Sequence, residues 1–340
     1  MNLALKDTFG RVLNYVRISV TDRCNYRCRY CMPEDGIDWI PHEEIMTYEN
    51  ILLLVSVLKG LGVKRIRFTG GEPFVRRGFI QFLEEVIGTF PSIAVAVTTN
   101  GSFLERDAKY LAPLPLDSLN ISLDTLDEEK FRQMTRTGDL NLVLRGIDSV
   151  VKLRKTPVKL NTVVMRDFNL QEVPEIISYS REKGLFLRFI EFMPLDSDVW
   201  LKKQFVPVSE ILSLLPDPAL WSPLLKGEES SLPETPRGPA RYLVNSVTGQ
   251  MIGVISAVSE HFCETCNRLR VTSTGEVRPC LFSSDGVSII EALRRGDAKG
   301  VREGMLAAAL NKPCEGATGI PAVEPLGHPK EERHMSRIGG

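Results

Sequence analysis

The sequence predicts an α/β protein built around a parallel β-sheet. Short strands rich in β-branched residues alternate with helical patterns six times in about 200 residues. The helical patterns end at glycines, and polar residues follow the strands. Because parallel strands are joined by right-handed crossovers, this alternation predicts either a partial barrel or a doubly wound open sheet. In both folds ligands collect at the carboxyl ends of the strands.

The elements are expected in a regular order along the chain. The predicted strands lie at residues 14–20, 63–69, 93–99, 118–123, 158–164 and 185–192. Helical patterns lie between them, for example at residues 47–62 and 169–184, and glycine at the end of each is a natural stop. After about residue 205 the alternation ends.

The polar residues that follow the predicted strands are unusual. They lie in the stretches SVTDRCNYRCRYC, TGGEP, TTNG, SLD and RFIEFMP, and the fifth strand itself contains Lys159 and Asn161. Any one of them is explained by a cap or a turn. Together they predict one ligand site at the mouth of the sheet.

Composition excludes several functional classes. The net charge of −1 gives no reason to expect nucleic acid or an anionic membrane as partner. The longest apolar run, Ile51 to Val55, is too short to span a bilayer, and the amino terminus lacks the apolar segment of a secretory signal. We therefore expect a cytoplasmic protein with no membrane or nucleic-acid partner.

Three regions are predicted. Residues 1–222 hold the strand–helix units, and residues 223–240, rich in Pro, Gly, Ser and Glu, are expected to form a flexible linker. Residues 241–340 are expected to form a smaller α+β region, with a hairpin that turns at Thr248-Gly249 and a helix within residues 288–296.

The seven cysteines include two triplets, Cys24, Cys28 and Cys31, then Cys263, Cys266 and Cys280. An odd number in a large chain with no secretory signal favours metal binding or catalysis over disulfides. Three thiolates suit an iron–sulfur cluster with one open iron. Zinc remains an alternative at each triplet, completed by His42 at the first and by His261 or Cys314 at the second.

A family resemblance selects among these possibilities. The string DTFGRVLNYVRISVTDRCNYRCRYCMPEDG resembles the start of the radical S-adenosylmethionine (SAM) enzymes, including an aromatic residue, Tyr30, before the last cysteine. RFTGGEP, VTTNG, NISLDTL, LNTVVMRDFN, RFIEFMP, the second triplet and the final Gly-Gly resemble the GTP 3′,8-cyclase family in particular. The resemblance implies a partial (β/α)6 TIM-like barrel with a smaller C-terminal α+β region closing its open side.

The resemblance also implies the cofactors and the reaction. Each triplet would hold a [4Fe-4S] cluster, the first binding SAM at its open iron and the second binding the purine of GTP. Reductive cleavage of SAM would yield a 5′-deoxyadenosyl radical that takes the C3′ hydrogen of GTP. The C3′ radical would attack C8 of the guanine, in the first step of molybdenum cofactor biosynthesis.

Several site residues follow from the same resemblance. The implied SAM contacts are Tyr30, Gly71, Glu72, Ser122 and Met193, with Glu72 accepting from the methionyl ammonium. The implied GTP contacts are Arg17, Arg67, Thr98, Lys159, Arg268 and Arg270. Arg17, Arg268 and Arg270, with Gly339 and Gly340 of the tail, are implied as catalytic. Because the chain has no G-x4-G-K-[ST] loop, side chains must supply the charge for a triphosphate.

Partners and rival classes complete the expectations. The resemblance implies an external electron donor, a homodimer, and a product used by the next enzyme of the pathway, cyclic pyranopterin monophosphate synthase. The rivals are a peptide-modifying radical SAM maturase, which carries more C-terminal cysteines, and an electron carrier or zinc-dependent binding protein. Iron and zinc analysis would separate them.

Overall fold

The computed structural model describes residues 4–153, 158–195, 202–224, 239–283, 285–315 and 335–338. Its strands are β1 (Tyr15–Ser19), β2 (Arg65–Thr69), β3 (Ala94–Thr99), β4 (Ser118–Ser122), β5 (Val158–Val164), β6 (Phe186–Glu191), β7 (Trp221–Pro223), β8 (Arg241–Asn245), β9 (Met251–Ile255), β10 (Arg268–Val271), β11 (Glu276–Arg278) and β12 (Val287–Ser288). Its α-helices are α1 (Tyr48–Gly60), α2 (Phe79–Thr89), α3 (Leu104–Leu111), α4 (Glu128–Thr135), α5 (Leu140–Leu153), α6 (Val173–Glu182), α7 (Val208–Ser213), α8 (Ile290–Arg294), α9 (Ala298–Leu310) and α10 (Met335–Ile338).

The order of the strands decides between the two predicted folds. Strands β1 to β6 are neighbours in chain order, and all five of these pairings are parallel. A doubly wound sheet would reverse its order at a switch point, whereas a (β/α) barrel keeps neighbours in sequence. The sheet ends at β12 on one side and at β7 on the other. The partial barrel is therefore confirmed.

The C-terminal strands continue the same sheet at both of its edges. Strand β9 pairs in parallel with β6, and β10 pairs in parallel with β1. The predicted hairpin is confirmed as β8–β9, with Gly249 at a φ of +66° in the turn. Of the predicted linker, residues 225–238 lie outside the described residues, and Pro223 ends β7. The division into residues 1–222, 223–240 and 241–340 stays a prediction, because the described strands of the first and the last of these regions form one continuous sheet.

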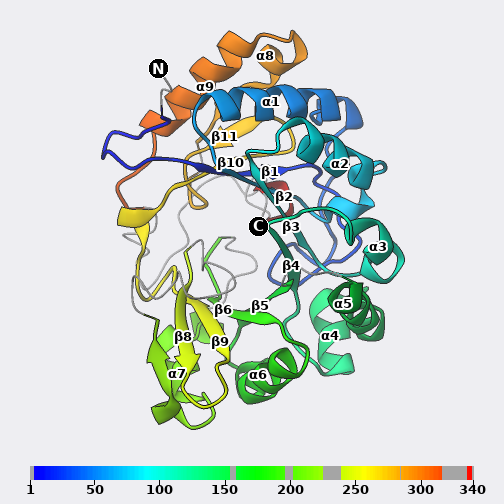
Figure 1. Cartoon of the computed structure of the whole chain (residues 1–340), viewed down its shortest axis with the longest axis vertical. Coiled ribbons are helices and arrows are strands. Elements are labelled where there is room, and N and C mark those ends of the chain that lie inside the picture. The colour runs from blue at the N-terminus through cyan, green and yellow to red at the C-terminus, as the bar shows by residue number, and fades with distance from the viewer. Residues whose placement is uncertain are drawn as a thin grey trace.

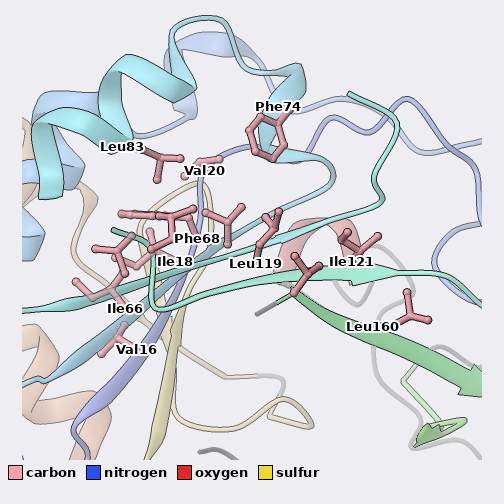
Figure 2. Packing of buried hydrophobic residues seen from close by; sticks show 14 of the residues in the cluster. Val16, Ile18, Val20, Ile66, Phe68, Phe74, Leu83, Leu119, Ile121 and Leu160 are labelled. Atoms are coloured by element: carbon pink, nitrogen blue, oxygen red, sulfur yellow. The ribbon is translucent and has the colours of Figure 1, made fainter. Parts of the chain in front are cut away.

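Alternating side chains explain how the sheet separates core from site. Val16 and Ile18 of β1 are fully buried beside Ile66 and Phe68 of β2, and Figure 2 shows this apolar face together with Leu83 of α2. Residues between them on each strand point to the opposite, inner face because the side-chain period of a strand is two. Each such large side chain stabilises the fold by about 1.5–3 kcal/mol when buried. Figure 1 shows α1 to α6 along the outside of the curved sheet.

Local signals set the ends of the predicted helices. A capping box formed by Thr47 and Asn50 begins α1, and Gly62 follows its end at a φ of +80°. Helix α6 begins beside Pro174 and ends before Gly184, which has a φ of +64°. Both predicted helices are confirmed. In the part of the chain described here, none of the helices combines the length and apolar character that crossing a membrane requires.

Candidate functional site

The inner face of the sheet and the C-terminal segments line a cavity of about 230 Å³. The residues predicted from the sequence that line it are Arg17, Tyr30, Arg67, Thr98, Ser122, Met193, Cys263, Cys266, Arg268, Arg270 and Cys280. They come from β1 to β4 and the loop after β1, from the segment after β6, from β10 itself, and from the segments that precede β10 and follow β11. The structure therefore brings implied SAM contacts, implied GTP contacts and the second cysteine triplet to one cavity.

Three arginines lie side by side on this inner face. Arg17 of β1 is in register with Arg67 of β2 on one side and with Arg270 of β10 on the other. Neighbouring strands are only about 4.8 Å apart, so the three like charges are close together. Burial and the charge of Arg270 hold the pKa of Arg17 well below its usual value, and burial and Arg268 lower that of Arg270 to about 10. Such a row is costly in a core, but it is suited to an anion.

The charge balance of the described lining is strongly positive. It contains five arginines and one lysine against two carboxylates, Asp124 and Glu191. Both carboxylates already accept hydrogen bonds from backbone amides, Asp124 from Val163 and Glu191 from Val208 and Val258. The cavity therefore presents cations to a polyanionic ligand.

Sequence reasoning missed two of these cations, Arg188 and Lys312. Arg188 is buried on β6, and its Nε and Nη2 atoms have no hydrogen-bond partner among the described residues. The same holds for the Oδ1 atoms of Asn120 and Asn161, which also line the cavity. Buried polar atoms of this kind require a ligand or water as partner. The sequence did contain a signal for Arg188, because a charged residue within the apolar strand pattern of RFIEFMP is unusual.

Tyr15 is a further residue that sequence reasoning missed. It lines the cavity, and its hydroxyl accepts a hydrogen bond from Arg67 Nε at 2.5 Å. Burial raises the pKa of this phenol, but the charges of Arg67 and Arg17 outweigh burial and lower it to about 7. The phenol can therefore supply a negative charge among the arginines at neutral pH.

The first cysteine triplet lies in the loop that follows β1. Cys24 Sγ accepts hydrogen bonds from Tyr26 N at 3.4 Å and from Asn100 Nδ2 at 3.8 Å. Burial raises the pKa of Cys24 to about 11, and burial together with the neighbouring Cys31 and Cys24 thiols raises that of Cys28 well above its usual value. Cys31 N donates a hydrogen bond to the Cys28 carbonyl oxygen at 2.9 Å, so these two cysteines belong to one turn of the loop.

The TGGEP loop packs against the segment that leads into Cys24. A Cβ atom on Gly71 would lie 2.3 Å from the Arg23 carbonyl oxygen, and one on Gly70, at a φ of +148°, would lie 2.4 Å from that of Thr21. The two glycines are therefore required for this close approach of two backbone segments. The role of Gly71 as a SAM contact stays a prediction.

Glu72 is fully buried within the same loop. Its carboxylate accepts hydrogen bonds from Phe74 N, Thr99 Oγ1 and Asn100 N, while burial raises its pKa to about 7. Glu72 is not among the described residues that line the cavity. The structure shows it tying β2 to β3, and its contact with a methionyl ammonium stays a prediction.

Tyr30 connects the first triplet with the cavity. Tyr30 and Asp124 both line the cavity, and Asp124 accepts a hydrogen bond from Val163 N at 2.8 Å. Burial raises the pKa of Asp124 to about 6, although the hydrogen bond from Val163 and the neighbouring Tyr30 oppose the shift. Asp124 was not predicted individually, but it ends the SLD stretch that follows the fourth strand.

The second cysteine triplet lies among cations. Arg268 Nε donates to Cys266 Sγ at 3.4 Å, and Lys312 Nζ donates to the carbonyl oxygens of Arg268 at 2.9 Å and Pro279 at 2.8 Å. Burial raises the pKa of Cys266, but Arg268 and Lys312 outweigh it and lower the pKa to about 6. Within the described ranges, no three His, Cys, Asp or Glu side chains form a site for a single metal ion.

Comparisons with known proteins agree with this arrangement. Residues 18–179 match the Radical SAM superfamily, and residues 185–317 match the family Molybdenum Cofactor Synthesis C. The GTP 3′,8-cyclase of Alkaliphilus oremlandii is 38% identical over 343 residues, covering 99% of this chain and 100% of the relative. That of Thermodesulfovibrio yellowstonii is 39% identical over 338 residues, with the same coverage. The chain belongs to the GTP 3′,8-cyclase family of radical SAM enzymes.

Solved structures share the fold of this cyclase family member. Streptococcus suis SuiB has a TM-score of 0.62 at 12% identity, covering 93% of this chain and 68% of that chain. Native anSMEcpe with bound AdoMet has a TM-score of 0.58 at 17% identity, covering 92% of this chain and 93% of that chain. At these identities the likeness shows the radical SAM fold alone.

Membership in the radical SAM superfamily implies SAM and a [4Fe-4S] cluster. The first triplet fits the cluster, because three soft thiol donors lie near one another in one loop and share it with Tyr30, which lines the cavity. The raised thiol pKa values mean that binding iron must displace protons from these cysteines.

Further predicted site residues that are not among the described lining residues are Gly71, Lys159 and the three cysteines of the first triplet, Cys24, Cys28 and Cys31. Lys159 is buried on β5 in register with Asn120, so it shares the inner face of the sheet. Gly339 and Gly340 lie outside the described residues. Met335 of α10, four residues before Gly339, lines the cavity. The roles of Lys159 and of the two glycines stay predictions.

Proposed function

We propose that the protein catalyses the conversion of GTP into (8S)-3′,8-cyclo-7,8-dihydroguanosine 5′-triphosphate, the first step of molybdenum cofactor biosynthesis. The C3′ hydrogen of GTP moves to a 5′-deoxyadenosyl radical, and C3′ then bonds to C8 of the guanine. One electron and one proton complete the product. SAM and its cluster supply the radical when bound, as cofactors do in radical enzymes.

The row of Arg17, Arg67 and Arg270 is the observation that carries this proposal. It lies in the same cavity as the second cysteine triplet, so a ligand held there has a strongly anionic part and a part that faces the thiols. GTP has this form, with a triphosphate for the arginines and a purine for a metal centre. Arginine favours phosphate because its planar donors bind oxygens in pairs.

The residues that line the cavity support a division of roles. Tyr30, Ser122 and Met193 are proposed to contact SAM bound at a first cluster on Cys24, Cys28 and Cys31. Cys263, Cys266 and Cys280 are proposed to hold a second [4Fe-4S] cluster that binds the purine. The pKa of Cys266 is lowered, which favours the thiolate form that iron requires. Both substrates would then be held in one cavity, where proximity accelerates the reaction.

Other partners belong to the proposal as well. The reaction consumes electrons, so we propose an external electron donor, and the product would pass to cyclic pyranopterin monophosphate synthase. A homodimer is proposed from the family alone. The size of the cavity and the net charge of −1 support a small-molecule substrate over nucleic acid.

Nucleotide-dependent formation of deoxyadenosine tests the function. The protein is reconstituted with iron and sulfide without oxygen and then incubated with SAM, a reductant and GTP, ATP, CTP or UTP. We expect formation of deoxyadenosine to depend on GTP and to be matched by a cyclised nucleotide that retains the triphosphate. Equal deoxyadenosine with all four nucleotides, and no cyclised product, would contradict the proposed substrate.

Tyr15 predicts a pH dependence of GTP binding. Because its pKa is lowered to about 7, the phenolate predominates above that pH and adds negative charge beside the proposed phosphate site. Binding of GTP should therefore take up a proton and weaken as pH rises from 7 to 8, by at most about tenfold per pH unit. Calorimetric titration of the reconstituted protein with GTP between pH 6 and 8.5 measures this.

The matched control for that titration is Tyr15→Phe. Phenylalanine keeps the ring but cannot ionise, so the variant should lose this part of the pH dependence. Ionisation of GTP itself affects both proteins equally. Identical pH profiles for the two proteins would show that Tyr15 does not titrate near the ligand.

A further inference from the structure

Arg136 has an unusual backbone conformation immediately after α4. Its φ is +62°, in the left-handed region that favours glycine, and Arg136 and Asp217 are the non-glycine residues with positive φ in the described part of the chain. Conformations of this kind persist only where the surroundings maintain them, and they are common at functional sites. The energetic cost of this backbone conformation must therefore be offset by the contacts that the Arg136 side chain makes.

The guanidinium of Arg136 closes the loop that carries the first triplet. Its Nη1 atom donates hydrogen bonds to the carbonyl oxygens of Arg27 at 2.8 Å, Met32 at 3.2 Å and Pro33 at 3.2 Å. The first acceptor directly precedes Cys28 and the second directly follows Cys31. One charged donor thus joins the two ends of the segment that contains both thiols.

The backbone next to Arg136 holds the same loop. Arg27 N donates to the Thr135 carbonyl oxygen and Arg29 N to that of Met134, each at 2.9 Å. Thr137 Oγ1 donates to the Asn25 carbonyl oxygen at 2.8 Å. The last residues of α4 and the turn after it therefore contact the loop on both sides of Cys28, and Arg136 lies between these contacts.

We propose that Arg136 is a positioning residue for the first cluster, because it holds the loop of residues 27–33 in the form that presents Cys28 and Cys31 to iron. When the loop is already ordered before iron binds, none of the binding free energy is lost in ordering it. Glycine would adopt the same backbone without strain but would supply no donor. The proposal rests on the proposed assignment of the first cluster to Cys24, Cys28 and Cys31.

Resistance of the first cluster to a chelator tests this role. The reconstituted proteins are reduced, and addition of SAM changes the electron paramagnetic resonance signal only of the cluster that binds it. We expect this SAM-responsive signal to decay under an iron chelator about ten- to a hundredfold faster in Arg136→Gly than in the natural protein. Arg136→Lys, which keeps a charged donor, should lie between them. The thermal midpoint of the metal-free Arg136→Gly protein should stay close to that of the natural protein, because the relief of backbone strain offsets the loss of the Arg136 hydrogen bonds.

The controls separate this proposal from the cluster assignment. Arg132→Ala alters an exposed arginine of α4 that lies one turn before Arg136 and whose ion pair with Glu128 is 3.7 Å long, and its cluster should decay like that of the natural protein. Cys28→Ser should give no SAM-responsive signal, and a normal signal there would overturn the cluster assignment. If Cys28→Ser behaves as expected but Arg136→Gly keeps its cluster, the role of Arg136 is wrong. The positioning role is also wrong if the faster decay in Arg136→Gly is accompanied by a large fall in the thermal midpoint of the metal-free variant, because general loss of stability would then explain it.

Discussion

Replacement of Cys28 by serine is expected to reduce SAM cleavage to the level of a protein-free mixture. Cys28 is the central thiol of the first triplet, and its raised pKa reflects burial and the nearby Cys31 and Cys24. Two thiolates cannot keep a four-iron cluster in place with an open iron, so no radical can be generated. Deoxyadenosine formed from SAM and reductant, with iron content measured on the same sample, checks this.

The matched control for this change is Cys314→Ser. Cys314 is an exposed cysteine of the same chain that belongs to neither triplet. The variant should keep the iron content and the activity of the natural protein. SAM cleavage in Cys28→Ser at a rate close to that of Cys314→Ser would refute the assignment of the first triplet.

Replacement of Cys280 by serine is expected to abolish cyclisation of GTP while leaving slow cleavage of SAM in place. Cys280 lines the cavity beside Lys312, far in the sequence from the first triplet. The variant should lose the iron of the second cluster and reduce cyclisation of GTP at least about a hundredfold. Slow SAM cleavage without GTP should persist, because the first triplet is intact. Iron analysis, deoxyadenosine and cyclised nucleotide are measured in parallel.

Two outcomes would contradict this second prediction. A Cys280→Ser protein with full cyclase activity would refute the second cluster. Loss of the SAM-responsive signal of the first cluster would show instead that Cys280 supports the whole fold. The thermal midpoint of the metal-free protein distinguishes a local effect from unfolding.

The sequence predicted the parts of the fold that depend on local patterns. Six strands and the helices α1 and α6 were located correctly, because strand alternation and glycine stops are encoded within a few residues. The parallel pairing of β10 with β1 was not predicted. It joins Arg17 to Arg270 across more than 250 residues, and no local pattern records such a contact.

The sequence by itself determined the chemistry of the donors: two thiol triplets, each with three cysteines at short spacing, and a set of arginines inside apolar strands. Only the tertiary structure decided which of them meet. It placed Arg17 between Arg67 and Arg270, added Arg188 and Tyr15 to the same cavity, and aimed Arg136 at the first cysteine loop. Residue identity is local, whereas register between distant strands and a strained turn are products of the whole packed chain.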